Sequence, residues 1–263
     1  AAPAVVNIYS RTRSAQRTPI IEDPFFRRFF GEETPLAPPR EQTSLGSGVI
    51  VGAEGLIVTN HHVIAGADEI TVVLWDRREF KAEVVRTDER TDLAVLRIDG
   101  AGRALPFLEL ADSDALEVGD LILAIGNPFG VGQTVTSGII SALARTNVGI
   151  ADFNFFIQTD AAINPGNSGG ALVTMDGRLA GVNTAIFSRS GGSQGIGFAV
   201  PANMVRTVIA SVGAGVLRRP WLGAKGQTVT PELAASLGLD RPVGSVLREI
   251  YPRGPADRAG LQP

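Results

Sequence analysis

Short apolar stretches, with alternating or continuous hydrophobic positions, dominate the chain between about residues 45 and 200. Turn-forming stretches such as GAEG, WDRR and MDGR separate them, and this pattern predicts β-strands joined by turns. The predicted strands cover residues 47–51, 56–60, 69–75, 79–87, 93–98, 120–126, 133–144, 154–159, 170–175, 178–186 and 195–200. About a dozen short strands favour an all-β fold, either a sandwich or paired barrels, because closed antiparallel sheets hide their edges. Two six-stranded antiparallel barrels would fit.

The stretches that flank this region have other patterns. Residues 1–44 contain one strand-like run at 5–9, followed by a long loop. Four phenylalanines of the loop have the spacing of one helical face, namely Phe25, Phe26, Phe29 and Phe30. Residues 201–213 have apolar positions at helical spacing and a proline at the start, which predicts a helix that closes the domain at about residue 214.

A change of composition at GAGVLRRP predicts a linker over residues 215–220. Residues 221–263 then read as a strand, a short helix around PELAASLGL, a second strand and the start of another helix at GPADRAG. A stretch of this length is short for a hydrophobic core of its own. We therefore interpret it as part of a second domain.

Composition narrows the chemistry. The chain has 263 residues, 44% of them hydrophobic, and a net charge of −3, so no overall field attracts it to nucleic acid or to an acidic membrane. It has no cysteine, which excludes a thiol nucleophile, a thiolate metal site and a disulfide framework, and leaves the compartment open. No apolar run predicts a membrane helix, and the N-terminus lacks the layout of a signal peptide, so we expect a targeting segment to be absent or removed.

The segment DAAINPGNSGGALV, residues 160–173, places Ser168 among glycines between two predicted strands. Glycines let the backbone turn tightly and direct successive N–H groups to one point, which is how an oxyanion hole is built. A tetrahedral intermediate on Ser168 would then find donors among Gly166, Asn167 and Ser168. Glycine-rich turns with a serine are also common without a catalytic role, so a nucleophile here requires a general base.

Only two histidines, His61 and His62, can supply that base. They follow the predicted strand LIVTN, where one ring could face a cleft and the other solvent. The orienting carboxylate should be buried. Asp92 directly precedes a strongly apolar strand, whereas its competitor Asp88 lies in a more polar turn. The order His, Asp, Ser is that of chymotrypsin-like proteases and differs from the α/β-hydrolase and subtilisin orders.

The motifs TNHHVI, TDLAVLRI, GNPFG, TVTSGII and QTDAAINPGNSGGAL resemble the HtrA/Deg family of serine proteases over nearly the whole chain. The resemblance implies that His62, which precedes the valine, is catalytic together with Asp92 and Ser168. It also implies a chymotrypsin-like domain of two β-barrels over residues 45–214, to which residues 1–44 belong, with no metal or other cofactor.

The same resemblance implies that residues 221–263 are an incomplete PDZ domain. Its carboxylate-binding loop would be Trp221, Leu222, Gly223 and Ala224. Family members are typically periplasmic, extracellular or organellar stress and quality-control proteases that form trimers, and an aromatic N-terminal segment contributes to assembly. The phenylalanine cluster would therefore either take part in a trimer or pack on its own barrel.

Substrate preference is expected to depend on the position six before the nucleophile, Ala162, and on its neighbour Ile163, neither of which can pair with a basic side chain. The pocket wall is expected to come from a later strand, from the residues Asn183, Thr184, Ala185 and Ile186. Small or medium aliphatic side chains would be favoured. Two loops resemble the activation loops of the family: the turn Asn127, Pro128, Phe129 and Gly130, and residues 188–197. Their glycines would allow the site to switch between conformations. The alternative is that both loops are flexible turns without a regulatory role.

The leading hypothesis is therefore a serine endopeptidase acting on unfolded or misfolded proteins. A regulatory protease with one partner substrate, a chaperone-like peptide-binding module, and a β-rich structural protein with a chance GNSGG motif are the alternatives. If the chain were a structural protein, the order His62, Asp92, Ser168 would be a coincidence. A binding module that does not cleave peptides would be expected to lack a member of the triad, and here all three are present.

Overall fold

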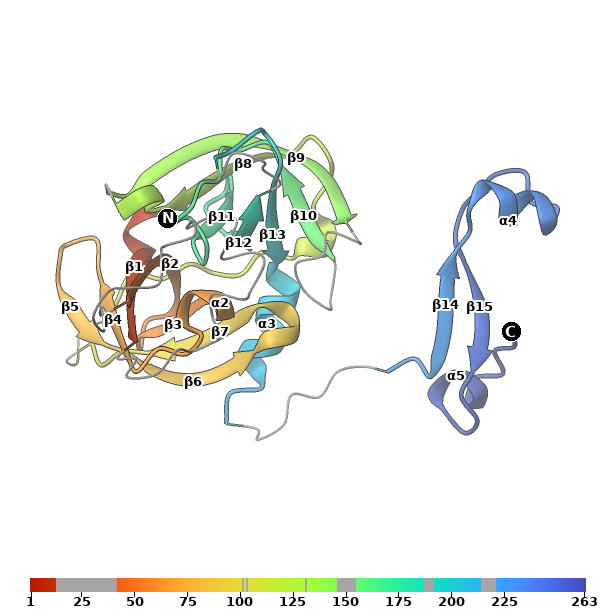
Figure 1. The fold of residues 1–263 in the computed structure, drawn as a ribbon, viewed down its shortest axis with the longest axis horizontal. Coiled ribbons are helices and arrows are strands. Elements are labelled where there is room, and N and C mark those ends of the chain that lie inside the picture. Colours follow the sequence, from red (N-terminus) through yellow and green to blue (C-terminus); the bar gives the residue numbers. More distant parts are fainter. Residues whose placement is uncertain are drawn as a thin grey trace, which may run out of the picture. The chain divides into compact units, whose positions relative to one another are not determined.

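The computed structural model describes residues 1–12, 42–100, 102, 104–130, 132–145, 155–186, 192–213 and 221–263. The phenylalanine cluster at 25–30 and part of the second predicted activation loop lie outside these residues. Strands dominate the described chain, as the sequence pattern predicts (Figure 1).

The N-terminal half contains a seven-stranded antiparallel sheet in the order β5-β4-β1-β2-β3-β7-β6. Its strands are β1 (Val5–Thr12), β2 (Gln42–Gly52), β3 (Leu56–Asn60), β4 (Glu69–Val73), β5 (Glu79–Lys81), β6 (Glu83–Asp88) and β7 (Leu93–Arg97). The short helix α2 (His61–Ile64) follows β3, and single 3-10 turns occur at η1 (Ala2–Ala4) and η3 (Glu89–Thr91). The strand predicted at residues 5–9 is thus confirmed as part of β1.

This sheet differs in one detail from the predicted six-stranded barrel. Its two edge strands, β5 and β6, are separated in sequence by Ala82 alone. The Ala82 N–H donates to the Ile70 carbonyl at 2.9 Å, so the chain keeps contact with β4 while it bends. The single strand predicted at 79–87 is therefore one bent strand that joins both edges, and the sheet is rolled without a closed hydrogen-bond ladder.

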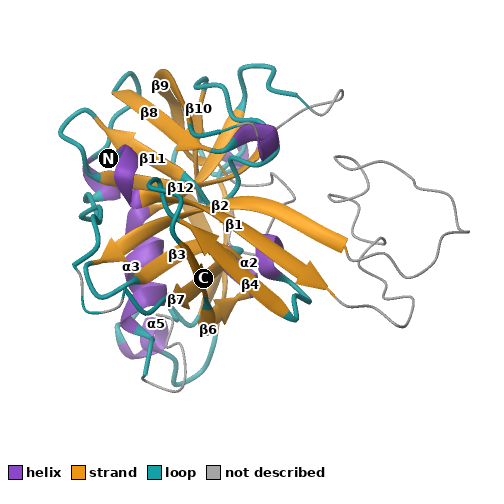
Figure 2. Ribbon diagram, turned by 90° about the vertical axis from the view of Figure 1, so that its left-hand side faces the viewer, coloured by secondary structure: helices purple, strands orange, loops and turns teal. Residues whose placement is uncertain are grey.

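The C-terminal half of the same unit is a closed barrel of six strands in the order β10-β13-β12-β11-β8-β9. They are β8 (Leu121–Gly126), β9 (Thr134–Arg145), β10 (Phe156–Thr159), β11 (Ala171–Thr174), β12 (Leu179–Ile186) and β13 (Gly197–Pro201). The 3-10 turns η4 (Ser113–Ala115) and η5 (Pro128–Gly130) precede and follow β8. The predicted closing helix is α3 (Ala202–Ala210), which begins after Pro201 (Figure 2). Its Val205 and Val208 are buried.

The central strands explain why the sheet is stable. Every residue of β3 is buried, as are the first four of β7, so both strands are buried on both faces. Ile57, Leu93 and Leu96 are fully buried there. Burying a side chain of this size contributes about 1.5–3 kcal/mol, so these two strands form a firm base for the residues at their ends.

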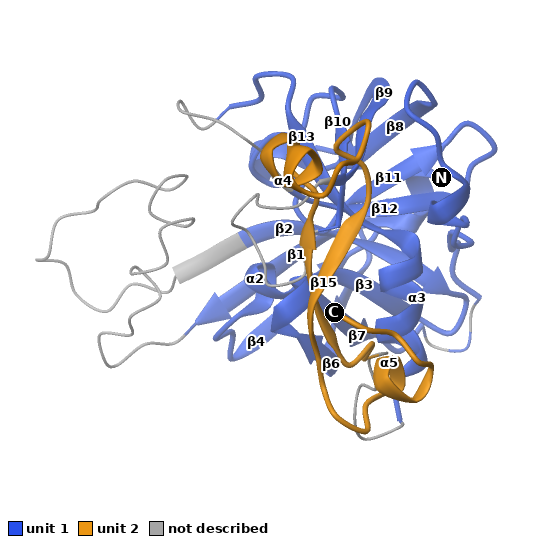
Figure 3. Ribbon diagram, turned by 90° about the vertical axis from the view of Figure 1, so that its right-hand side faces the viewer, with its two compact units in different colours: residues 1–215 blue, residues 216–263 orange. Residues whose placement is uncertain are grey.

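Contacts divide the chain into two compact units, Ala1–Gly215 and Val216–Pro263 (Figure 3). The second unit pairs β14 (Ala224–Thr228) with β15 (Ser245–Ile250) and adds the short helices α4 (Pro231–Ser236) and α5 (Pro255–Arg258). Its described apolar side chains are buried at three places only, namely Val229, Ala234 and Ala256. A two-stranded sheet with so small a core is marginal by itself.

Candidate active site

The register of β3 and β7 brings His62 to Asp92. Asn60, the last residue of β3, pairs with Leu93, the first residue of β7. The chain segments just beyond this pair must therefore also lie side by side, and the His61 N–H donates to the Asp92 carbonyl at 3.1 Å. Two positions that are 30 residues apart in sequence meet because two buried strands end together.

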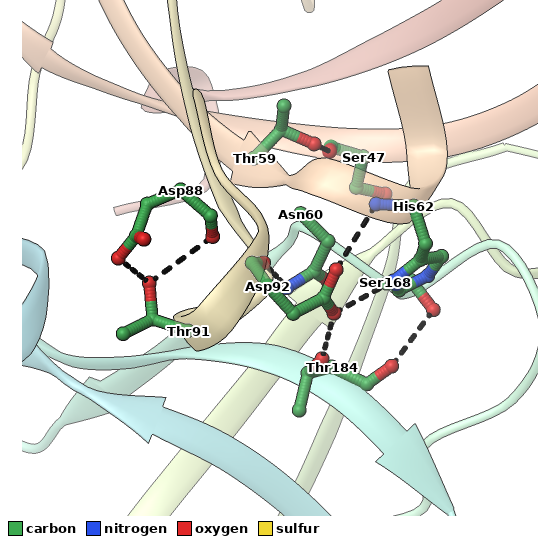
Figure 4. A network of polar contacts seen from close by, with 9 residues as sticks. All are labelled: Ser47, Thr59, Asn60, His62, Asp88, Thr91, Asp92, Ser168 and Thr184. Carbon is green, nitrogen blue, oxygen red and sulfur yellow. Dashed lines mark hydrogen bonds and ion pairs between the residues drawn. The ribbon is translucent and has the colours of Figure 1, made fainter. Parts of the chain in front are cut away.

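The Asp92 carboxylate is held from three directions. Its Oδ1 accepts the His62 backbone N–H at 3.0 Å, and its Oδ2 lies 2.7 Å from His62 Nδ1 and 2.7 Å from the Thr184 hydroxyl (Figure 4). The Asp92 backbone has a φ of 55°, a left-handed conformation that aspartate tolerates better than most residues. The carboxylate thus fixes the orientation of the imidazole through Nδ1.

The electrostatics agree with an ionised carboxylate. Burial raises the pKa of the Asp92 carboxyl, but the charge of the His62 imidazole and the hydrogen bonds from His62 and Thr184 outweigh it, so that this pKa lies below its ordinary value. Asp88, the competing acid, instead accepts a hydrogen bond from the Thr91 hydroxyl within its own turn. The structure therefore favours Asp92 as the partner of His62.

Ser168 lies at the start of the ladder between β11 and β12. The Gly169 N–H donates to the Asn183 carbonyl at 2.7 Å, and the Ser168 hydroxyl donates to the Thr184 carbonyl at 3.3 Å. Thr184 therefore contacts two of the predicted catalytic residues, Ser168 through its carbonyl and Asp92 through its hydroxyl (Figure 4). The three residues predicted from sequence belong to one connected network.

Hydrogen bonds hold carbonyl groups of the glycine-rich loop, residues 165–170. Four successive carbonyls each accept a hydrogen bond: Pro165 from Phe129 N–H at 2.9 Å, Gly166 from the Ser47 hydroxyl at 2.7 Å, Asn167 from Gly170 N–H at 2.9 Å and Ser168 from Ser47 N–H at 2.8 Å. The C=O of one residue and the N–H of the next belong to the same trans peptide and point in opposite directions. The Gly166 N–H therefore points away from Phe129, which binds the Pro165 carbonyl, and the Ser168 N–H points away from Gly170, which binds the Asn167 carbonyl. Neither donates to an acceptor in the described chain.

This arrangement separates the three predicted oxyanion donors. Gly166 and Ser168 have N–H groups available for a ligand, whereas the Asn167 N–H donates to the Asn164 carbonyl at 2.9 Å. The Asn167 backbone is therefore engaged within the loop. Gly166 has a φ of 99° and Gly169 a φ of 83°, which explains why glycine is needed on both sides of the serine.

The predicted pocket residues differ in burial and in the direction of their side chains. Ile163 is buried in the barrel core and packs against Gly197, where an added Cβ would lie 2.8 Å from the isoleucine side chain. Ala162 is partly buried. Asn183 and Thr184 turn their side chains inward, since the Asn183 amide donates to the Ala171 carbonyl at 3.0 Å and the Thr184 hydroxyl contacts Asp92. The structure does not describe the side chains of Ala185 and Ile186.

The Asn127–Gly130 turn adjoins the glycine-rich loop. Phe129 adopts a left-handed φ of 55° and exposes its ring, while its N–H holds the Pro165 carbonyl. Asn127 is buried, and its side-chain oxygen accepts the Gly132 N–H at 2.8 Å. A predicted activation loop and the predicted oxyanion loop are thus in direct contact.

The predicted carboxylate-binding loop lies in the second unit. Trp221 packs against Tyr251 with 5.4 Å between ring centroids, and the carbonyls of Leu222 and Gly223 accept the N–H groups of Ala256 and Tyr251, both at 2.9 Å. Ala224 begins β14. These two carbonyls are therefore bound within the unit.

The described part of the chain contains no cluster of three or more His, Cys, Asp or Glu side chains placed to hold an ion. No helix in the described ranges is long and apolar enough to cross a membrane.

Sequence reasoning missed three polar residues that support the site. Thr184 was assigned to the pocket wall but binds Asp92, Ser47 in β2 binds the glycine-rich loop, and the Asn60 amide donates to the Asp92 carbonyl at 2.9 Å. Asn60 directly precedes the two histidines, which was a usable signal. Nothing in the local sequence of Ser47 or Thr184 indicates their partners.

Comparisons with known proteins agree with this geometry. The family model described as a trypsin-like peptidase domain matches residues 46–182. A probable periplasmic serine endoprotease DegP-like of Ectopseudomonas mendocina is 45% identical over all of this chain, and the periplasmic pH-dependent serine endoprotease DegQ of Escherichia coli is 44% identical over 99% of it. The chain spans 58% and 57% of the lengths of these two relatives.

A solved structure of the HtrA-type protease AlgW with a decapeptide superposes with a TM-score of 0.71 and 53% identity. The match covers 100% of this chain and 81% of the AlgW chain. The family model covers more than half of the sequence, and the similarity to AlgW extends over both units. The chain therefore belongs to the trypsin-like peptidases and, among them, to the HtrA-type serine proteases.

Proposed function

We propose that this chain carries the catalytic domain of a serine endopeptidase, with Ser168 as nucleophile and His62 as general base. The observation that carries the proposal is the contact of 2.7 Å between Asp92 Oδ2 and His62 Nδ1, made in the same network that holds Ser168. A carboxylate on Nδ1 selects the tautomer in which Nε2 can accept a proton.

The reaction would begin when Ser168 Oγ attacks the carbonyl carbon of a peptide bond and His62 Nε2 accepts the hydroxyl proton. His62 then delivers this proton to the leaving amine, which leaves an acyl-enzyme. Water activated by the same imidazole hydrolyses the ester and restores Ser168. Asp92 keeps its negative charge throughout and stabilises the imidazolium form of His62.

The N–H groups of Gly166 and Ser168 would stabilise the oxyanion. They are free within the described chain, and the carbonyls of the same loop are already bound. Donors that are fixed in advance stabilise a developing charge without reorganisation, and the loss of one such donor typically costs about 10²–10³ in kcat.

The substrate preference that we propose is for small or medium aliphatic side chains at the cleaved bond. Ala162 is partly buried and Ile163 packs in the barrel core beside Gly197, and neither can neutralise a basic side chain. A lysine or arginine buried there would lack a partner, which is costly.

The setting that we propose is the periplasm, with unfolded or misfolded proteins as substrates. The names of the DegP-like and DegQ relatives support this compartment. Unfolded chains expose the aliphatic residues that such a pocket accepts, whereas folded proteins bury them.

The test is digestion of an unfolded, cysteine-free protein by this chain and by its Ser168→Ala variant, with cut sites identified by mass spectrometry. Cuts after Val, Ala or Ile that disappear in the variant would support both enzyme and pocket. Cuts after Lys or Arg would contradict the pocket alone.

Absence of cleavage calls for a second measurement, labelling of the protein by a fluorophosphonate. Labelling that requires Ser168 would support an endopeptidase with a restricted substrate or a resting state. Neither cleavage nor labelling would contradict the proposed function and favour a peptide-binding module.

A further inference from the structure

Ser47 is a fully buried polar residue in the middle of β2 that does not belong to the predicted triad. Its hydroxyl donates to the Gly166 carbonyl at 2.7 Å and accepts the Asn127 N–H at 3.0 Å. Its backbone N–H donates to the Ser168 carbonyl at 2.8 Å, and its own carbonyl accepts the Thr59 hydroxyl at 2.7 Å. Each polar group of Ser47 thus has a partner.

Two of these contacts hold the peptide units that directly follow the free N–H groups, those that begin with the Gly166 and Ser168 carbonyls. Ser47 fixes the carbonyl of Gly166 through its hydroxyl and the carbonyl of Ser168 through its backbone. Gly166 is a glycine at a φ of 99°, so its own side-chain sterics do little to restrict its backbone. The Ser47 hydroxyl therefore supplies a restraint that the loop lacks.

The third contact joins this loop to the Asn127–Gly130 turn. The Asn127 N–H and the Gly166 carbonyl share one hydroxyl group, that of Ser47, which accepts from the first and donates to the second. The same turn also holds the Pro165 carbonyl through the Phe129 N–H. A shift of this turn would thus change two of the four restraints on the glycine-rich loop.

We infer that Ser47 is a positioning residue for the oxyanion hole. Its hydroxyl links the orientation of the Gly166 and Ser168 N–H groups to the position of the Asn127–Gly130 turn. The inference rests on the proposed endopeptidase function. It differs from a purely structural role of Ser47 in one measurable respect, because a misaligned oxyanion hole weakens the transition state more than it weakens substrate binding.

The experiment compares wild type with Ser47→Ala in the full chain. It measures kcat and KM on a chromogenic peptide ester of valine, and the affinity for a peptidyl boronic acid, which forms a tetrahedral adduct with the nucleophilic serine. We expect kcat to fall about 10- to 100-fold, somewhat less than after loss of a direct donor, with KM changed by less than about 3-fold. Boronate affinity should fall by a factor similar to that of kcat.

Ser113→Ala is the matched control. Ser113 is also buried, and its hydroxyl accepts a backbone N–H, that of Asn203 at 3.1 Å, but at the start of α3. This variant should lower the thermal midpoint while kcat stays within about 2-fold of wild type. If Ser47→Ala does not fold, Ser47→Cys, which keeps nearly the same shape but bonds weakly, takes its place.

Each outcome decides the inference. A folded Ser47 variant with kcat and boronate affinity within about 3-fold of wild type overturns it, whatever its thermal midpoint. A kcat/KM that falls only because KM rises, with kcat unchanged, also overturns it, because such a change indicates altered substrate binding. If wild type itself neither cleaves the ester nor binds the boronate, the proposed function fails, and the inference fails with it.

Discussion

The hydroxyl of Thr184 donates a hydrogen bond of 2.7 Å to Asp92, although the two residues are 92 positions apart in sequence. Thr184 belongs to β12 of the closed barrel, and Asp92 precedes β7 of the rolled sheet. The two sheets of the first unit therefore meet at the carboxylate that orients His62. The alignment of the site depends on how the sheets pack as well as on each sheet's own register.

Thr184→Val tests this contact, since valine keeps the shape and removes the hydroxyl. A hydrogen bond to a charged group contributes about 1.5–3 kcal/mol, so we expect kcat/KM to fall about 10- to 100-fold. The pKa of the Asp92 carboxyl should move back towards its ordinary value. Thr184→Ser keeps the donor and should retain most of the activity in the same assay. Equal activity of the valine variant and wild type would show that the contact is dispensable.

Asp92→Asn should lower kcat by roughly 10⁴. The amide is similar in size, but its NH₂ replaces one acceptor. In one orientation the NH₂ would face His62 Nδ1 and the Thr184 hydroxyl, and in the other it would leave the His62 backbone N–H without an acceptor. The wrong tautomer cannot accept the proton of Ser168. Steady-state kinetics on the chromogenic ester checks this, with circular dichroism as the control for folding. A loss of less than about 10-fold would argue against the assigned role.

The stability contributed by Asp92 should depend on pH. Its carboxyl has a lowered pKa in the folded protein, so its contribution is present above the unfolded-state value, about 3.9, and is lost as the pH falls through the folded-state value. Urea unfolding of wild type and Asp92→Asn should therefore differ more at about pH 5 than at about pH 2.5. A difference that stays constant between these conditions would contradict the linkage.

Gly169→Ala should destabilise the protein far more than Gly177→Ala. Both glycines have positive φ, 83° and 86°. An added Cβ at Gly169 would lie 2.1 Å from the Ser47 carbonyl oxygen and 2.3 Å from the Thr59 hydroxyl, whereas at Gly177 nothing lies within 4 Å. We expect a cost of about 1–2 kcal/mol at Gly177 from backbone strain and more than about 3 kcal/mol at Gly169, measured by urea unfolding. Similar costs at both would show that the loop can move away from Ser47.

Much of the fold could be predicted from local pattern. The strand positions followed from short apolar runs and their turns, because a buried strand needs apolar side chains along its whole length and each turn needs residues that tolerate its backbone. Ala82 is an exception. The bend there joins the two edge strands of one sheet, but the strand pattern continues through it, so the sequence predicts a single strand over 79–87.

The candidate site was predictable where scarcity or a motif limited the choice. A chain with two histidines offers few general bases, and glycines around Ser168 indicated a loop built from backbone donors. The order His, Asp, Ser then selected the type of protease. These features belong to single residues or short segments, so they can be recognised without knowledge of the fold.

What the sequence by itself determined is therefore which groups are candidates for the chemistry, and in which strands and loops they lie. Only the tertiary structure decided which groups hold them. Ser47 reaches Gly166 across 119 positions and Asn127 across 80, and Thr184 reaches Asp92 across 92. Such contacts depend on sheet register and on how two sheets pack, and a serine or threonine in a strand has the same local pattern whether its hydroxyl meets a catalytic loop or solvent.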